Sequence, residues 1–241
     1  MTDYMEKSIL NRLKDYVNVF IDRLSKQKNL TNPNLSCHRI LLFGNDSKNL
    51  NSIEFLFSQY LSALNQHDVH LIRSSYLPDL IDSKDISFFV SPSIESALNL
   101  SFIKIYYLQD YRNLIKHLID ISVDNKKQML PIAILIDDVY SYLLNEREVS
   151  QEIETESSQP KRKRFKKNTV HNDDDLQILM RICCFLIETI EYCSLKLNRN
   201  TYLIIKIDLN HFYVDDLEKQ RLFLQKLTTR YFSNEINVDQ I

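Results

Sequence analysis

Near the amino terminus, apolar residues recur at three- and four-residue steps, the spacing of one face of a helix. They are Ile9, Leu10, Leu13, Tyr16, Val17, Phe20, Ile21 and Leu24. The pattern predicts an amphipathic helix within residues 1–30, which the turn-forming sequence Thr31-Asn32-Pro33-Asn34 ends. Such a helix can close the edge of a sheet or bind the groove of a partner, and the sequence leaves both open.

From residue 35 onward, short apolar runs alternate with helical patterns. Strands are predicted at 39–43, 69–72, 86–90, 102–107, 132–136 and 201–209, and helices at 53–64, 111–119, 176–197 and 217–231. Strands that are apolar throughout are buried on both faces, which is typical of a mostly parallel sheet covered by helices on both sides. We therefore predict a single α/β domain formed by residues 35–145 and 174–235.

Residues 146–173 interrupt this alternation. Apolar periodicity is almost absent there: five glutamates precede Ser157-Ser158-Gln159-Pro160, and a basic run follows. A segment this polar buries too little surface to offset its ordering entropy. The prediction is a disordered charged insertion.

Six basic residues of the insertion dominate the positive charge of the chain. They are Lys161, Arg162, Lys163, Arg164, Lys166 and Lys167. The rest of the chain has 24 basic and 32 acidic residues, so the body is acidic although the formal net charge of the whole chain is −2. A long nucleic-acid groove across the folded body is not expected. The run itself fits a nuclear localisation signal, a nonspecific phosphate-binding arm or a solvated linker, and we expect a nuclear protein.

Gly44 is the only glycine in 241 residues. It follows the first predicted strand, where a phosphate-binding loop of the form GxxxxGK[ST] would begin. Asn49 stands at the second glycine of that motif, Leu50 at its lysine and Asn51 at its hydroxyl residue, while Lys48 comes too early. This degenerate Walker A motif lacks the phosphate-neutralising charge and the Mg²⁺ ligand, so we expect neither ATP as a cofactor nor ATP hydrolysis.

The strand 132–136 followed by Asp137 has the form of a Walker B motif, in which an acid orients Mg²⁺. A buried strand whose final aspartate caps the next turn has the same pattern, and the degenerate loop favours that alternative. Asp137 and Asp138 are adjacent and would point to opposite faces, so they do not form a catalytic pair. The sequence gives no catalytic residue.

Neither the cysteines nor the histidines show the spacing of a metal site. The four cysteines form no CxxC pair and are expected as buried free thiols in a reducing compartment. Among the six histidines only His67 and His70 are close, and we predict surface positions for them. No apolar run reaches the length of a membrane-spanning helix.

Taken in order, several segments resemble the RecA-like recombinase paralogues, most closely the small subunits of Shu complexes. The matching segments are Ile40–Gly44, Val69–Ile72, Phe102–Ile105 with Tyr111–Leu114, Pro131–Asp137, the cysteine-bearing helix, Tyr202–Ile205 and Leu227–Phe232, within about residues 38–235. The resemblance implies an obligate heterodimer with a SWIM zinc-finger protein that supports recombinase filaments on single-stranded DNA in homologous-recombination repair. Only Gly44 and Asp137 carry over, as a vestigial nucleotide site, and we expect them side by side at the carboxyl ends of neighbouring strands.

Two other interpretations remain. The accessory ring of Elongator also consists of RecA-like subunits without a working Walker A motif, and its members act in tRNA wobble-uridine modification. The third interpretation is an active ATPase with an unconventional loop.

Overall fold

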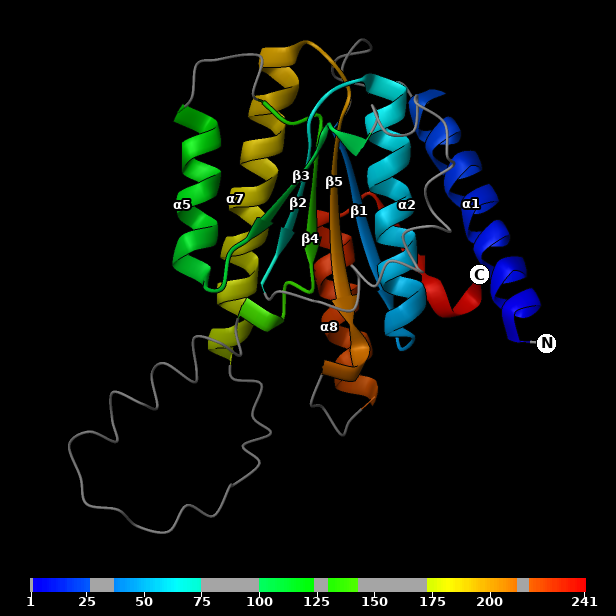
Figure 1. The fold of residues 1–241 in the computed structure, drawn as a ribbon. Coiled ribbons are helices and arrows are strands. Elements are labelled where there is room, and N and C mark those ends of the chain that lie inside the picture. Colours follow the sequence, from blue (N-terminus) through cyan, green and yellow to red (C-terminus); the bar gives the residue numbers. More distant parts are fainter. Residues whose placement is uncertain (1, 27–36, 75–99, 124–129, 143–172, 212–216) are drawn as a thin grey trace, which may run out of the picture.

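The computed structural model describes residues 2–26, 37–74, 100–123, 130–142, 173–211 and 217–241 (Figure 1). The predicted strand 86–90 and the basic run Lys161–Lys167 lie outside the described residues, as does nearly all of the insertion 146–173. Its last residue, Asp173, is the first residue of a helix.

The centre of the molecule is a six-stranded sheet. Its strands are β1 (Cys37–Gly44), β2 (Val69–Arg73), β3 (Ile103–Tyr107), β4 (Ala133–Asp137), β5 (Thr201–Asp208) and β6 (Asn234–Asn237), in the order β3-β2-β4-β5-β1-β6. Every pairing between them is parallel. The predicted mostly parallel α/β sheet is therefore confirmed, and this arrangement is consistent with a RecA-like fold.

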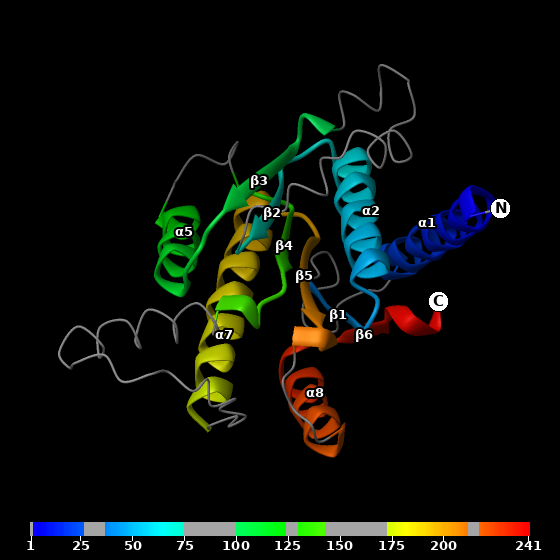
Figure 2. The same ribbon diagram turned by 60° about the horizontal axis from the view of Figure 1, so that its bottom comes forward.

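Helices cover both faces of the sheet. The helices are α1 (Thr2–Lys26), α2 (Ser47–Asn65), α5 (Tyr111–Val123), α7 (Asp173–Leu197) and α8 (Leu217–Tyr231), with short 3₁₀ turns η3 (Leu209–His211) and η4 (Val238–Gln240). Figures 1 and 2 show α1 and α2 on one side and α5, α7 and α8 on the other. The reason is handedness: the chain moves along the sheet in one direction from β1 to β2 and in the other from β3 to β6, and right-handed crossovers then place their helices on opposite faces.

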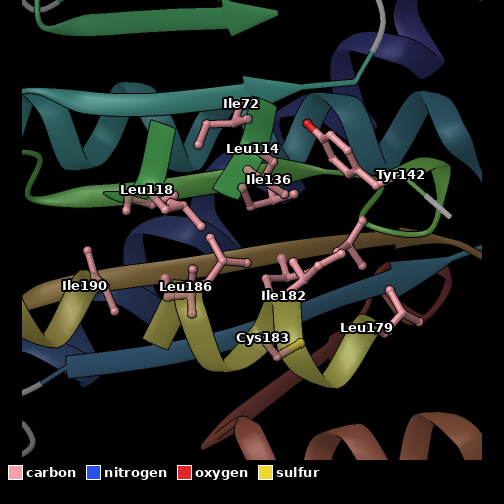
Figure 3. Close-up of a cluster of buried hydrophobic side chains, with 14 of the residues drawn as sticks. Ile72, Leu114, Leu118, Ile136, Tyr142, Leu179, Ile182, Cys183, Leu186 and Ile190 are labelled. Atoms are coloured by element: carbon pink, nitrogen blue, oxygen red, sulfur yellow. The ribbon is translucent and has the colours of Figure 1, made fainter. Parts of the chain in front are cut away.

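The core beneath α5 and α7 is formed by aliphatic side chains from the strands and from both helices. Figure 3 shows Leu114 and Leu118 of α5 close to Ile136 of the sheet, and Ile182 and Leu186 of α7 belong to the same buried cluster. Of the four free cysteines, Cys183 and Cys193 are buried and burial raises the pKa of each thiol to about 12. Cys184 is exposed and Cys37 is half-buried, so the prediction of four buried thiols is confirmed only for Cys183 and Cys193.

The apolar stripe of α1 packs inside the chain. Leu13, Val17, Phe20, Ile21 and Leu24 are buried, and α1 lies along α2. They belong to one core cluster with Ile236 of the outer strand β6 and Val238 after it. These five side chains are therefore not exposed for a partner's groove.

Among the described residues, no helix has the length and apolar character needed to cross a membrane.

Candidate functional site at the carboxyl edge of the sheet

The turn after β1 is too short for a phosphate-binding loop. Only Asn45 and Asp46 separate Gly44 from Ser47, the first residue of α2. Asp46 is the N-cap: its Oδ1 accepts the backbone N–H of Asn49 at 3.0 Å. The Walker A motif needs four residues before its second glycine, so this strand and helix are joined without the segment that would wrap around phosphates.

An internal carboxylate occupies the anion-binding position of this turn. Asp239, in η4, accepts the backbone N–H of Asn45 at 2.9 and 3.0 Å and that of Asp46 at 3.2 Å. The side chain of Asn45 donates a further hydrogen bond to Asp239 Oδ2 at 2.9 Å. The backbone donors that a phosphate would require are therefore satisfied by a residue 194 positions away in sequence.

Gly44 is required by this close approach. Its φ is not positive, so no left-handed conformation demands a glycine. A Cβ built at Gly44 would lie 2.8 Å from Oδ1 of Asp239 and 3.5 Å from Cβ of Val238. The glycine makes room for the carboxylate.

The carboxylate of Asp137 lies in a buried network of four charged side chains. Its Oδ1 is paired with the ammonium of Lys206 from β5, and its Oδ2 lies 3.3 Å from Nη1 of Arg73 from β2. Arg73 Nη2 also pairs with Oε2 of Glu54 from α2 at 2.9 Å, and Lys206 Nζ lies 3.8 Å from that same oxygen. None of the four residues is more than 5% exposed.

The network occupies the place where a Walker B acid would meet Mg²⁺. Both oxygens of Asp137 are engaged by cations, so a metal ion would have to displace two ion pairs that are shielded from water. The alternative in which Asp137 caps the following turn is also wrong, because its carboxylate points to these cations. The described residues at this edge thus do not fit a Mg²⁺–nucleotide complex.

The titration of Glu54 and Lys206 is perturbed by their burial in this network. Burial raises the pKa of Glu54 to about 7, against the opposing effect of Lys206, and one of its oxygens, Oε1, has no hydrogen-bond partner. For Lys206, burial alone would lower the pKa, but Glu54 and Asp137 outweigh it and the net pKa is raised. The lysine therefore remains charged between the two carboxylates.

Gly44 and Asp137 lie at the same edge but not on neighbouring strands. Gly44 ends β1 and pairs in register with Asp208 of β5, whereas Asp137 ends β4 on the far side of β5. The expectation of neighbouring strands is wrong, because β5 is inserted between them and brings Lys206 into the space beside Asp137.

Asp208 connects the two parts of this edge. Its Oδ2 accepts the hydroxyl of Ser47 at the start of α2, and its Oδ1 accepts the backbone N–H of Asn210 at 2.9 Å. The side chain of Asn210 donates to the carbonyl of Asn45. The turns after β1 and β5 are thereby fastened to each other.

Sequence reasoning did not single out Lys206, Arg73, Glu54 or Asp239. A signal existed for the first three: Lys206 and Arg73 lie within or at the end of largely apolar strands, and Glu54 interrupts the apolar run 53–57. Charged residues at such positions are buried only when paired. No comparable signal marks Asp239, because it lies in a short polar segment far from Gly44 in sequence.

His70 corrects the expectation of surface histidines. It is 4% exposed, and its ring packs against Tyr106 of β3 and His117 of α5 at centroid distances of 4.8 and 5.6 Å. Nδ1 of His70 and Nε2 of His117 have no hydrogen-bond partner. Burial, together with His117 and Lys104, lowers the pKa of His70 to about 3, and burial also lowers that of His117.

This cluster predicts a loss of stability in mild acid. Below pH 6.5 the unfolded state takes up a proton that the folded His70 refuses, so unfolding becomes easier by about 1.4 kcal/mol per pH unit down to about pH 3. Glu54 has the opposite effect between about pH 4.5 and 7, because its folded pKa is raised. We therefore compare urea unfolding of the natural protein and His70→Gln between pH 5 and 6.5. The free energy of unfolding should fall less steeply with decreasing pH in the variant, because the contribution of His70 is absent. Equal pH dependence of the two proteins would show that His70 titrates normally.

In the part of the chain that the structure describes, no three or more His, Cys, Asp or Glu side chains are grouped so as to hold a metal ion.

No protein-family profile matches this chain, and no curated protein matches it by sequence.

Proposed function

We propose that this chain is a non-catalytic, RecA-like subunit of a Shu-type heterodimer in homologous-recombination DNA repair. In this role it binds a SWIM zinc-finger protein in the nucleus and promotes recombinase filaments on single-stranded DNA. The observation that carries the proposal is a parallel sheet, consistent with the RecA-like fold, whose expected nucleotide positions are engaged within the same chain: the turn after Gly44 binds Asp239, and Asp137 pairs with Lys206.

The charges at the sheet edge support a binding role. Phosphoryl transfer depends on cationic groups and Mg²⁺ that face the phosphates and neutralise developing charge. Here the cations Arg73 and Lys206 are directed inward to Glu54 and Asp137, and a carboxylate fills the anion position. Because these ion pairs and hydrogen bonds fix the edge of the sheet in one conformation, the edge is suited to binding a protein partner and not to phosphoryl transfer.

The basic run supplies the nuclear signal in this proposal and an additional contact to DNA phosphates. It concentrates six positive charges in a chain that is otherwise acidic. Contacts of this kind weaken steeply with salt, because binding releases counterions from the nucleic acid.

Affinity purification of the full-length tagged protein from its native cells tests the proposal. We expect a SWIM zinc-finger protein in near-equal amount, both with the natural chain and with a variant in which Lys161, Arg162, Lys163 and Arg164 are alanine. The variant, fused to a fluorescent protein, should move from the nucleus to the cytoplasm.

Other outcomes would contradict the proposal. Recovery of two other RecA-like subunits together with the tRNA-modifying Elongator assembly would assign the chain there. Recovery of neither partner would reject both assignments, and an unchanged nuclear signal would reject the localisation role of the run.

A further inference from the structure

Strand β3 lies at one side of the sheet, and no strand of the described residues pairs with its outer edge. Phe102 and Leu108 flank the strand, and each forms a backbone hydrogen bond of 2.8 Å with β2. The even-numbered residues of this segment therefore direct their backbone groups to β2. Because these groups alternate along a strand, the N–H and C=O groups of Ile103 and Ile105 are directed to the outer edge. An edge of this kind is a template for a further strand.

The face of β3 on the α2 side of the sheet is apolar and partly exposed. It carries Ile103, Ile105 and Tyr107, which alternate with Tyr106 on the opposite face. Ile103 packs against the core cluster beneath α2, whereas Ile105 is 47% and Tyr107 is 40% exposed. Natural edge strands usually carry charged or otherwise protected positions that prevent pairing, and these two side chains instead favour it.

The sequence of β3 is complementary to itself in an antiparallel register centred on Ile105. In that register Ile105 lies opposite Ile105 of a second copy, and Ile103 lies opposite Tyr107, so apolar side chains meet along the exposed face. The only charged residue of the strand, Lys104, lies opposite Tyr106. A register centred on Lys104 would instead place two lysines directly opposite each other, which destabilises a pair of strands.

The charges on α5 fit the same twofold axis. His117 of α5 contacts Tyr106 with ring centroids 4.3 Å apart, so the flank of the helix that carries His117 lies beside β3 at the level of the axis. Burial lowers the pKa of His117 and the charge of Asp120 opposes this effect, so Asp120 lies near that flank. Lys116 and Asp120 are both exposed, one turn apart. A twofold axis at Ile105 makes the two α5 helices antiparallel and brings Lys116 of each toward Asp120 of the other.

We propose that β3 pairs with β3 of a second copy of this chain about a twofold axis at Ile105, which extends the sheet from one copy into the other. The ion pairs between Lys116 and Asp120 flank this pairing on the α5 side. Figure 2 shows β3 and α5 at the end of the molecule away from α1. The strands that carry Gly44 and Asp137 are not outer strands, so the pairing leaves their carboxyl ends available to a different partner. This inference goes beyond the role in recombination and does not depend on it.

Sedimentation velocity of the full-length chain tests the proposal at concentrations from about 1 to 100 μM. The natural protein should be a dimer at the upper end of this range. Ile105→Glu places two carboxylates at the twofold axis and should raise the dissociation constant about a hundredfold. The matched control is Val19→Glu on α1, where the side chain is 70% exposed, and this variant should dimerise like the natural protein. Urea unfolding verifies that each variant is folded.

Charge reversal on α5 gives a second measurement that leaves the strand unchanged. Lys116→Glu and Asp120→Lys should each weaken self-association about tenfold, because acid faces acid in the first dimer and lysine faces lysine in the second. An equimolar mixture of the two variants should dimerise like the natural protein, since each introduced charge then meets its opposite on the other copy. A role of either side chain within its own helix alone would give no such recovery.

Three results would overturn the proposal. The first is a natural protein that stays monomeric at about 100 μM, which is expected if the predicted strand 86–90 occupies the edge of its own chain. The second is dimerisation of Ile105→Glu as strong as that of the natural protein. The third is a mixture of the two α5 variants that associates no better than either variant alone. None of these results bears on the capture of a SWIM partner, so the two proposals fail separately.

Discussion

Lys206→Met should lower the free energy of unfolding by about 3–5 kcal/mol. The lysine is 4% exposed and lies between Glu54 and Asp137, with Asn51 accepting a hydrogen bond from its ammonium. Without it, Glu54 and Asp137 share the single cation Arg73, and Glu54, whose pKa Lys206 lowers, either stays ionised without its second cation or takes up a proton. The cost arises from this lost charge compensation, since methionine retains most of the apolar volume. Equilibrium urea unfolding at pH 7.5 measures it.

A second substitution separates charge imbalance from lost packing. Glu54→Gln in the Lys206→Met background leaves one acid facing one cation, so the double variant should recover about 1–3 kcal/mol. Lys226→Met on α8 is the matched control, because Lys226 is exposed, and it should change stability by no more than about 0.5 kcal/mol. If the double variant is less stable than Lys206→Met alone, Lys206 does not act by neutralising Glu54.

The second large effect is expected at the contact between α1 and α2. Phe57→Ala should cost about 3–5 kcal/mol, because the ring is fully buried and its removal leaves a cavity. The ring meets that of Phe20 edge-to-face at a centroid distance of 6.1 Å. Thermal and urea unfolding of the variant measure the loss.

A double-mutant cycle with Phe20→Ala tests whether α1 is docked in solution. Edge-to-face aromatic pairs couple by about 0.5–1.5 kcal/mol, and the two losses should be non-additive by that amount. Val19→Ala is the control on the outer face of α1, where the side chain is 70% exposed, and a change of no more than about 0.5 kcal/mol is expected. If Phe20→Ala costs as little as Val19→Ala, the helix is not packed on α2.

The hydrophobic pattern of the sequence predicted some strands of the sheet and missed one. Apolar runs at 132–136 and 69–72 predicted β4 and β2 to within one residue at each end, because both strands are buried on both faces and only His70 interrupts the apolar runs. β6 was missed, since Asn234–Asn237 carries one apolar residue in four and forms only by pairing with β1. Its pairing partner, 190 or more positions earlier, leaves no local trace.

The candidate site divides in the same way. Composition and spacing predicted that the loop at Gly44 lacks the chemistry of a phosphate-binding motif, and the turn of two residues before α2 agrees. That Asp239 takes the anion position, and that Lys206 takes the space beside Asp137, could not be predicted. The first depends on the pairing of β6 with β1 and the second on the pairing of β5 with β4, an order that alternating strands and helices do not specify.

The amino-acid sequence alone thus determined the parallel α/β architecture, because burial on both faces demands continuous apolar strands and amphipathic helices wherever they occur. It also determined that residues 44–51 lack the second glycine, the lysine and the hydroxyl residue of a phosphate-binding loop, because residue types at eight consecutive positions are read directly from the sequence. Only the tertiary structure decided which charges meet, because ion pairs and hydrogen bonds depend on distance in space. The partners of Asp137 and Gly44 come from strands and turns brought to one edge by the sheet order.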